Sequence, residues 1–263
     1  GYIISSTTGI HKGIKILSNV NMGLAMLLLL FVFITGPTVF ILETFVLAIN
    51  DYVTHFIEYS LRLQPYVGGT WVKDWTIFYW AWAIAWSPFV GSFVARVSRG
   101  RTIREFIVGV LIIPPIVSCI WIAVFGGSAI YFDLNKGTSI AQAVNNDLAT
   151  ALFQMLNELP FTFITSIIAM LLIFTFLVTS ADSATFIMAS MTSNGTLNPS
   201  MLSKIVWGVL MAAIASVLLF TDGLNTLQTA SLISALPFTI VMLLLIVSFV
   251  KMMRHESIPI TKR

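Results

Sequence analysis

Charged residues are scarce in this sequence. Asp, Glu, Lys and Arg make up 10 % of its 263 residues, and 57 % are hydrophobic. An ordinary soluble domain carries roughly 25 % charged residues. The mean hydropathy of +0.94 therefore excludes a soluble globular domain and predicts an integral membrane protein.

Cysteine, histidine and intramembrane acid are also nearly absent. The single Cys119 excludes an intrachain disulfide, and the three histidines lie outside the apolar runs without metal-ligand spacing. Asp182 is the one acidic residue in an apolar segment. Its role is either to form a structural ion pair or to take part in coupling. A membrane enzyme needs clustered His, Asp or Glu, so we expect no enzyme and no cofactor. The basic residues form no surface patch, so we expect no nucleic-acid partner.

Long apolar runs fill most of the chain. About 20 such residues cross a bilayer as a helix, so we predict an all-α membrane protein with six transmembrane helices. The runs are Val20–Leu42, Trp75–Ala95, Phe106–Phe132, Leu159–Ala181, Ile205–Thr221 and Gly223–Val250. Further expectations are a linker at His11–Asn21, Gly36-Pro37-Thr38 inside the first span, an outer amphipathic helix at Asn50–Leu63 and an outer helix at Ile140–Asn157.

The loops divide unevenly by charge. When they are assigned alternately to two sides, one side carries eleven Lys and Arg and the other carries three, namely Arg62, Lys73 and Lys136. The positive-inside rule makes the first side cytoplasmic. We expect a multi-pass plasma-membrane protein with both termini of this chain inside. Because Gly1 has no preceding Met, we also expect the C-terminal part of a longer protein.

The second apolar run carries an unusual aromatic stripe. Trp75, Tyr79, Trp82, Trp86, Phe89 and Phe93 follow helical spacing and share one face. Trp82 and Trp86 lie roughly 10 and 16 Å deeper than Trp75 at 1.5 Å per residue, so an interfacial aromatic belt does not explain them. Core packing and ligand contact both remain open. Aromatic faces bind cations, and without an acid nearby the ligand class is a zwitterion or a quaternary ammonium.

The fourth run turns rich in Ser and Thr near its end. Thr175, Thr179, Ser180 and Ser183 permit close helix packing or a sodium site, because hard cations prefer oxygen ligands.

These residues carry a family resemblance. The segments Trp75–Trp82, Trp86–Gly91 and Ala95–Phe106, together with Gly36-Pro37-Thr38, Phe125-Gly126-Gly127 and Thr179–Ala184, resemble the betaine/carnitine/choline transporter family, closest to sodium-coupled glycine betaine importers.

The resemblance implies the C-terminal half of a twelve-helix LeuT-type inverted-repeat transporter. Residues 1–47 then hold the end of a preceding helix, a linker and the last helix of the first repeat. Residues 48–73 form the outer amphipathic helix and loop, 74–252 the second repeat with five spans, and 253–263 a short cytoplasmic tail.

The resemblance also assigns a site. Its substrate-binding positions here are Phe78, Tyr79, Trp80, Trp82, Ala83 and Trp86. Ala83 replaces the second Trp of a pair and removes one cation-box wall. Since every neighbour fits, an introduced substitution is favoured over natural divergence. Sodium would take oxygens from Phe176, Thr179 and Ser180, with Phe89 near another sodium site.

The predicted function is import of glycine betaine or a related quaternary ammonium osmolyte, coupled to sodium, by alternating access. A sodium-independent exchanger of choline- or carnitine-type substrates and a cation channel or facilitator are the alternatives. Expected partners are the substrate, sodium, anionic lipids near Arg96–Arg104 and two further copies in a homotrimer.

Overall fold

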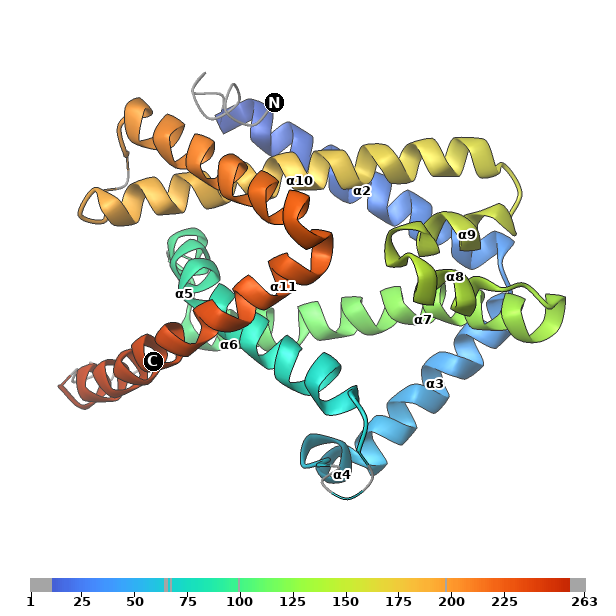
Figure 1. Cartoon of the computed structure of the whole chain (residues 1–263). Helices are drawn as coiled ribbons and strands as arrows, with labels where there is room; N and C mark the ends of the chain where they lie inside the picture. The colour runs from blue at the N-terminus through green and yellow to red at the C-terminus, as the bar shows by residue number, and fades with distance from the viewer. Residues whose placement is uncertain (1–10, 64–65, 67, 99, 197, 256–263) are drawn as a thin grey trace, which may run out of the picture. The chain divides into compact units, whose positions relative to one another are not determined.

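The computed structural model describes residues 11–63, 66, 68–98, 100–196 and 198–255. These residues form two compact units, Gly1–Leu61 with Gly100–Phe186 (unit 1) and Arg62–Arg99 with Ile187–Arg263 (unit 2). All regular structure in the described part of the chain is helical (Figure 1). Six helical segments there are long and apolar enough to span a membrane. The predicted all-α fold is confirmed, and the domain boundaries given above stay a prediction.

Unit 1 begins with a helix that breaks at Gly36-Pro37. Its elements are α2 (His11–Thr35), α3 (Thr38–Thr54), α4 (Phe56–Ser60), α6 (Ile103–Leu111), α7 (Ile113–Lys136), α8 (Ile140–Asn146), the 3₁₀ turn η2 (Leu148–Thr150), α9 (Ala151–Asn157) and most of α10 (Thr162–Thr192). The first span is Ile16–Thr35.

Three expectations near this break were wrong. The first span ends before Gly36, because Pro37 has no N–H to continue the helix. A Cβ on Gly36 would lie 2.5 Å from the carbonyl oxygen of Val32, so the close turn needs glycine.

The predicted linker at His11–Asn21 is helical and belongs to α2. The predicted outer helix at Asn50–Leu63 is instead the end of α3 followed by the short α4.

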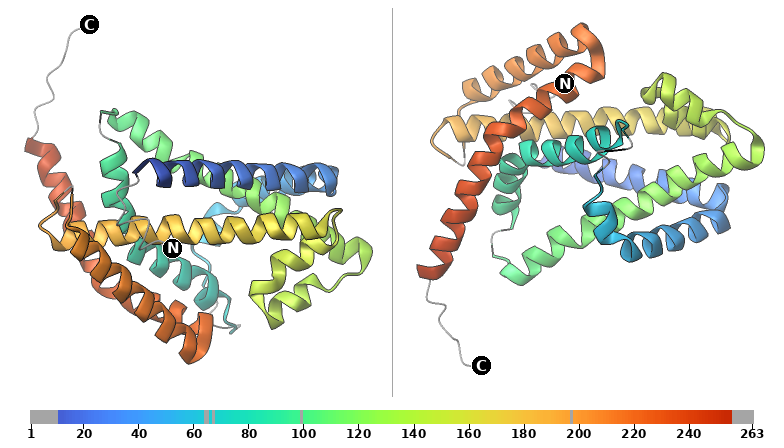
Figure 2. Two further views of the ribbon diagram at one scale, coloured as in Figure 1. Left: turned by 90° about the horizontal axis from the view of Figure 1, so that it is seen from above. Right: turned by 60° about the horizontal axis from the view of Figure 1, so that its bottom comes forward.

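The core of unit 1 joins α2, α3, α7 and α9. Leu28 and Val32 of α2 are buried with Ile41 of α3, Val124 of α7 and Leu156 of α9. In a membrane such contacts stabilise through van der Waals packing, because lipid tails are as apolar as the side chains. Figures 1 and 2 show α10 running alongside α2 in this unit.

The third span is a broken helix. Thr102 and Glu105 form a capping box at the start of α6, with Thr102 N donating to Glu105 Oε2 at 3.0 Å and Glu105 N donating to Thr102 Oγ1 at 3.3 Å. Prolines in the first turn of α7 interrupt the helix at Ile112. The two pieces still form one span, Ile103–Lys136, which confirms the predicted third crossing.

The following loop is organised by Asp133. Its carboxylate accepts the backbone N–H groups of Ile140 and Ala141, each at 2.8 Å, and the Thr138 hydroxyl. It thus caps α8, whose N-cap Ser139 makes no side-chain capping bond. The predicted single helix at Ile140–Asn157 is wrong, because α8 ends just before Asp147. The Asp147 carboxylate then accepts the N–H of Ala149 and so caps the next turn.

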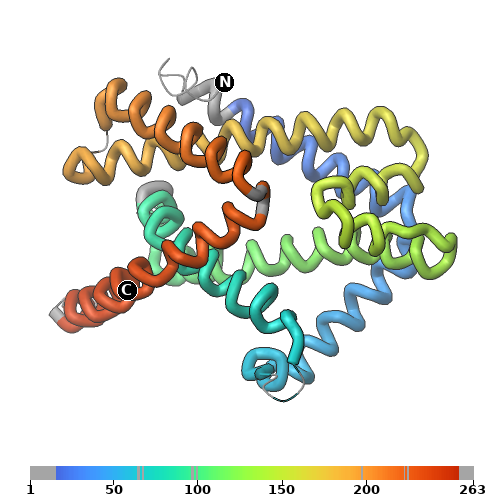
Figure 3. The backbone as a smooth tube through the Cα atoms, in the orientation of Figure 1, coloured from blue at the N-terminus to red at the C-terminus, as the bar shows by residue number. Residues whose placement is uncertain are grey.

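Unit 2 contains the π-helical turn η1 (Val72–Ile77), α5 (Phe78–Val97), the end of α10 and α11 (Met201–His255). α11 holds the last two spans, Met201–Thr221 and Asn225–Arg254, which confirms both predicted crossings. Between them Gly223 has a φ of +58°. In Figure 3 the trace of α11 changes direction along its length. α5 packs along α11.

Candidate functional site

The aromatic residues of η1 and α5 form a continuous ladder. The rings of Trp75 and Tyr79 stack with centroids 5.7 Å apart, Tyr79 meets Trp82 edge-on at 6.0 Å, and Trp82 meets Trp86 at 6.1 Å. Phe78 stacks on Trp82 at 6.4 Å with an interplanar angle of 6°. These separations are those of favourable aromatic pairs, so the ladder supports its own side-chain conformations.

The ladder is not buried in the core of unit 2. Trp82 and Trp86 expose 43 % and 52 % of their surface, and Trp80 exposes 70 %. Within the described residues the indoles pack on one another and leave surface for a further contact.

Ala83 belongs to the same face as the ladder. It lies four residues after Tyr79 and three before Trp86, the spacings that bring helical side chains together. Its side chain is exposed. A larger side chain at this position would therefore adjoin Tyr79 and Trp86, and alanine leaves that space open.

The sodium candidates lie on α10 in unit 1. Thr179 Oγ1 lies 3.0 Å from the carbonyl oxygens of both Thr175 and Phe176, and Ser183 donates to Thr179 O at 2.9 Å. Ser180 is half-buried and makes no hydrogen bond to the described residues. The oxygens form a row along one helix, while the fourth predicted residue, Phe89, lies on α5 in unit 2.

Sequence reasoning missed a partner of this row, Asn21. Its Oδ1 lies 2.7 Å from Thr175 Oγ1, across α2 and α10. Thr175 also lies 2.8 Å from its helical acceptor, Leu171 O. A hydroxyl has one hydrogen, so the amide oriented as a donor satisfies both groups best. The available signal was an amide inside an otherwise apolar span.

Two further polar groups of α10 are buried. Asp182 is 7 % exposed, and Thr185 donates to Ala181 O at 2.7 Å. An acidic group at this depth remains a candidate for coupling. Groups of three or more potential His, Cys, Asp or Glu metal ligands do not occur in the described part of the chain.

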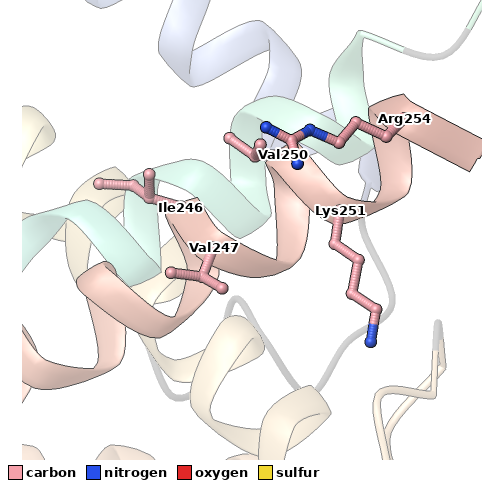
Figure 4. A pocket seen from close by; sticks show the side chains of 5 residues that line it. All are labelled: Ile246, Val247, Val250, Lys251 and Arg254. Carbon is pink, nitrogen blue, oxygen red and sulfur yellow. The ribbon is translucent and has the colours of Figure 1, made fainter.

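A hollow of about 400 Å³ lies at the far end of α11, lined by Ile246, Val247, Val250, Lys251 and Arg254. Figure 4 shows Arg254 folded back over Val250 while Lys251 extends away from it. The lining contains no aromatic side chain and none of the predicted site residues, so we do not assign the substrate to it.

Comparison with known proteins supplies the class. The family model described as "BCCT, betaine/carnitine/choline family transporter" matches residues 1–258. An ectoine/hydroxyectoine transporter of Virgibacillus pantothenticus is 62 % identical over 96 % of this chain and 50 % of its own length. The glycine betaine transporter OpuD of Bacillus subtilis (strain 168) is 46 % identical over 99 % of this chain and 51 % of its own.

This is a multi-pass membrane protein, and the chain belongs to the betaine/carnitine/choline transporter family. The predicted family and the prediction that the chain is not an enzyme are confirmed. The chain spans about half the length of those two relatives.

Proposed function

We propose that the protein imports a zwitterionic osmolyte of the betaine type, coupled to sodium, by alternating access. The observation that carries the proposal is the exposed aromatic ladder in a membrane span of a transporter-family chain. Aromatic faces attract a cationic group, with gains of about 2 kcal/mol per desolvated contact, and they need no carboxylate.

In this proposal Trp82 and Trp86 contact the cationic group of the substrate. Phe78, Tyr79 and Trp80 complete or support the aromatic surface. Phe78 stacks on Trp82, and Tyr79 meets Trp82 edge-on, so both residues support the Trp82 ring. Ala83 sets the width of the site, because a small side chain there leaves room between its aromatic neighbours.

Sodium is proposed to bind the oxygens on α10. The half-buried Ser180 hydroxyl is one proposed ligand, through the lone pairs of its oxygen. Thr179 can keep donating its one hydrogen to the carbonyl of Thr175 or Phe176, because sodium binds the lone pairs of the hydroxyl oxygen. The Phe176 carbonyl oxygen, which has two lone pairs, is proposed to bind sodium as well. Phe89 is proposed to lie near a second ion.

Ectoine is a second candidate substrate, favoured by two observations. One is the 62 % identity to a protein named as an ectoine/hydroxyectoine transporter. The other is Ala83, whose small side chain suits a ring better than a fourth aromatic wall. Ectoine is a cyclic amidinium carboxylate, and its planar cation can stack on an indole face.

Uptake by the full-length protein in proteoliposomes tests both versions. Labelled betaine and ectoine are supplied with an inward sodium gradient, with a potassium gradient of equal size, and with no gradient. Coupled import predicts accumulation with sodium alone. Uptake indifferent to sodium favours the exchanger of choline- or carnitine-type substrates, and uptake that never exceeds equilibrium favours a channel or facilitator.

We also propose the orientation, the lipid contacts and the oligomeric state of the protein. Both termini of this chain are placed in the cytoplasm of a plasma-membrane protein, anionic lipids contact Arg96–Arg104, and three copies associate. The exposed side chains of Arg101 and Arg104 suit lipid phosphates. Labelling of single cysteines at Thr102 and Thr138 from each side of sealed vesicles tests the orientation.

A further inference from the structure

The aromatic ladder ends beside an interruption in the hydrogen bonding of α5. Pro88 follows Trp86 by two residues and has no N–H to donate to the carbonyl of Ile84, four residues earlier. The neighbouring hydroxyl supplies the missing donor, since Ser87 Oγ lies 2.8 Å from Ile84 O. Ser87 is half-buried, so this bond is partly shielded from its surroundings.

The same hydroxyl reaches a second helix. Ser87 Oγ lies 2.6 Å from Met242 Sδ on α11, five residues beyond Pro237, the internal proline of that helix. Because a hydroxyl carries one hydrogen, Ile84 O and Met242 Sδ share a single donor. One group therefore repairs α5 and attaches it to α11.

Hydroxyl bonds to a carbonyl of the preceding turn are common in helices and need no functional explanation. α10 contains several, such as Ser183 to Thr179 O at 2.9 Å. Ser87 differs from these in two ways. Its acceptor has lost the usual N–H partner to Pro88, and its oxygen also contacts another helix.

We propose that Ser87 is a positioning residue for the aromatic ladder, which it orients through Met242. It sits directly after Trp86, so a change of helix direction at this point turns the indoles relative to α11. This role in transport rests on the proposed function, whereas the effect on α5 itself does not. Met242, with three rotatable side-chain bonds and a weak acceptor, allows the contact to re-form when the helices shift.

Three substitutions separate the two contacts. Ser87→Ala removes the donor from both acceptors, Met242→Leu removes only the sulfur at similar volume, and Ser87→Thr keeps a hydroxyl. In the full-length protein we expect Ser87→Ala to raise KM for the transported solute by about fivefold, the usual worth of one hydrogen bond, with kcat changed less. Met242→Leu should shift KM in the same direction by less, and Ser87→Thr should restore the original value.

The direction of α5 is measured without any substrate. Cys119→Ser gives a background free of cysteine in this chain, and spin labels replace the exposed side chains of Ile77 and Val90 on either side of Ser87. Thirteen residues of helix separate the labels by about 20 Å. We expect Ser87→Ala to shift or broaden this distance and Ser87→Thr to leave it unchanged.

The proposal predicts that the double variant Ser87→Ala, Met242→Leu is no worse than Ser87→Ala, since both changes break one contact. Additive effects on KM would overturn it. So would an unchanged label distance in Ser87→Ala, or a changed distance with KM unaffected. If the full-length protein carries neither betaine nor ectoine, the proposed function fails, and the label distance alone then decides what Ser87 does to the helix.

Discussion

Asn21 and Thr175 join two membrane helices through a single polar contact. The 2.7 Å separation of their side-chain oxygens links α2 to α10 one turn before Thr179. Polar contacts between membrane helices contribute about 0.6 kcal/mol on average, so this one is a small part of the stability. Its position makes it important, because it holds the first turn of the hydroxyl row.

Substitution of Asn21 by Leu should loosen that row. We expect a small loss of thermal stability, of about 1 kcal/mol or less, and a rise in the sodium concentration needed for half-maximal uptake. The matched control is Asn135→Leu, whose amide donates to Tyr131 O within its own helix. Equal sodium dependence of the two variants would show that Asn21 has no part in arranging the ion oxygens.

Ala83→Trp should change which solute is preferred. A fourth indole adds a cation–π contact of about 2 kcal/mol, or more than tenfold in affinity, so KM for betaine should fall by an order of magnitude. Ectoine uptake should decline, because the added ring occupies its space. The control Ala81→Trp places the same side chain off the ladder. A betaine affinity that does not respond to Trp at position 83 contradicts the proposed wall.

Thr179→Ala and Ser180→Ala should weaken sodium coupling. Each removes one oxygen from the proposed ion site, so half-maximal sodium should rise severalfold while substrate binding at saturating sodium changes little. Ser183→Ala is the control, because Ser183 makes the same type of bond one turn further along α10. The measurement is uptake against sodium concentration at constant ionic strength. A matching shift in the control would point to helix packing instead.

Asp133→Ala should release the start of α8. The variant loses the carboxylate that accepts from Ile140 N, Ala141 N and Thr138, at a cost of about 1 kcal/mol, as for other N-caps. Asp133→Asn should lie between wild type and Ala. Limited proteolysis in detergent should show faster cleavage between α7 and α9. If cleavage of both variants matches wild type, the loop is held by other contacts.

The spans were predictable because apolar length identifies a membrane helix directly. The aromatic face was predictable because Trp75, Tyr79, Trp82 and Trp86 keep helical spacing, and the ring contacts follow it. Gly36-Pro37 could be read in the sequence, but hydropathy does not show that Pro37 lacks an N–H. The break was therefore predicted to lie inside a span.

Contacts between distant segments could not be predicted. The Asn21–Thr175 and Ser87–Met242 contacts join residues 154 and 155 positions apart, and no local pattern connects them. The prediction of the loop helices failed for a related reason. Asp133 organises α8 from seven residues upstream of Ile140. Asp147 divides the second segment, where Asn145, Asn146 and Asp147 are consecutive poor helix formers.

The turn at Gly223 limits how the last two spans can respond to their neighbours. α11 is a continuous helix from Met201 to His255, with a left-handed backbone at Gly223, so no slack chain is available between the two spans. A displacement of the Met242 segment along its axis must pull on the span that precedes it. The final crossing therefore cannot slide independently, and a tag or added loop at this turn should be tolerated poorly.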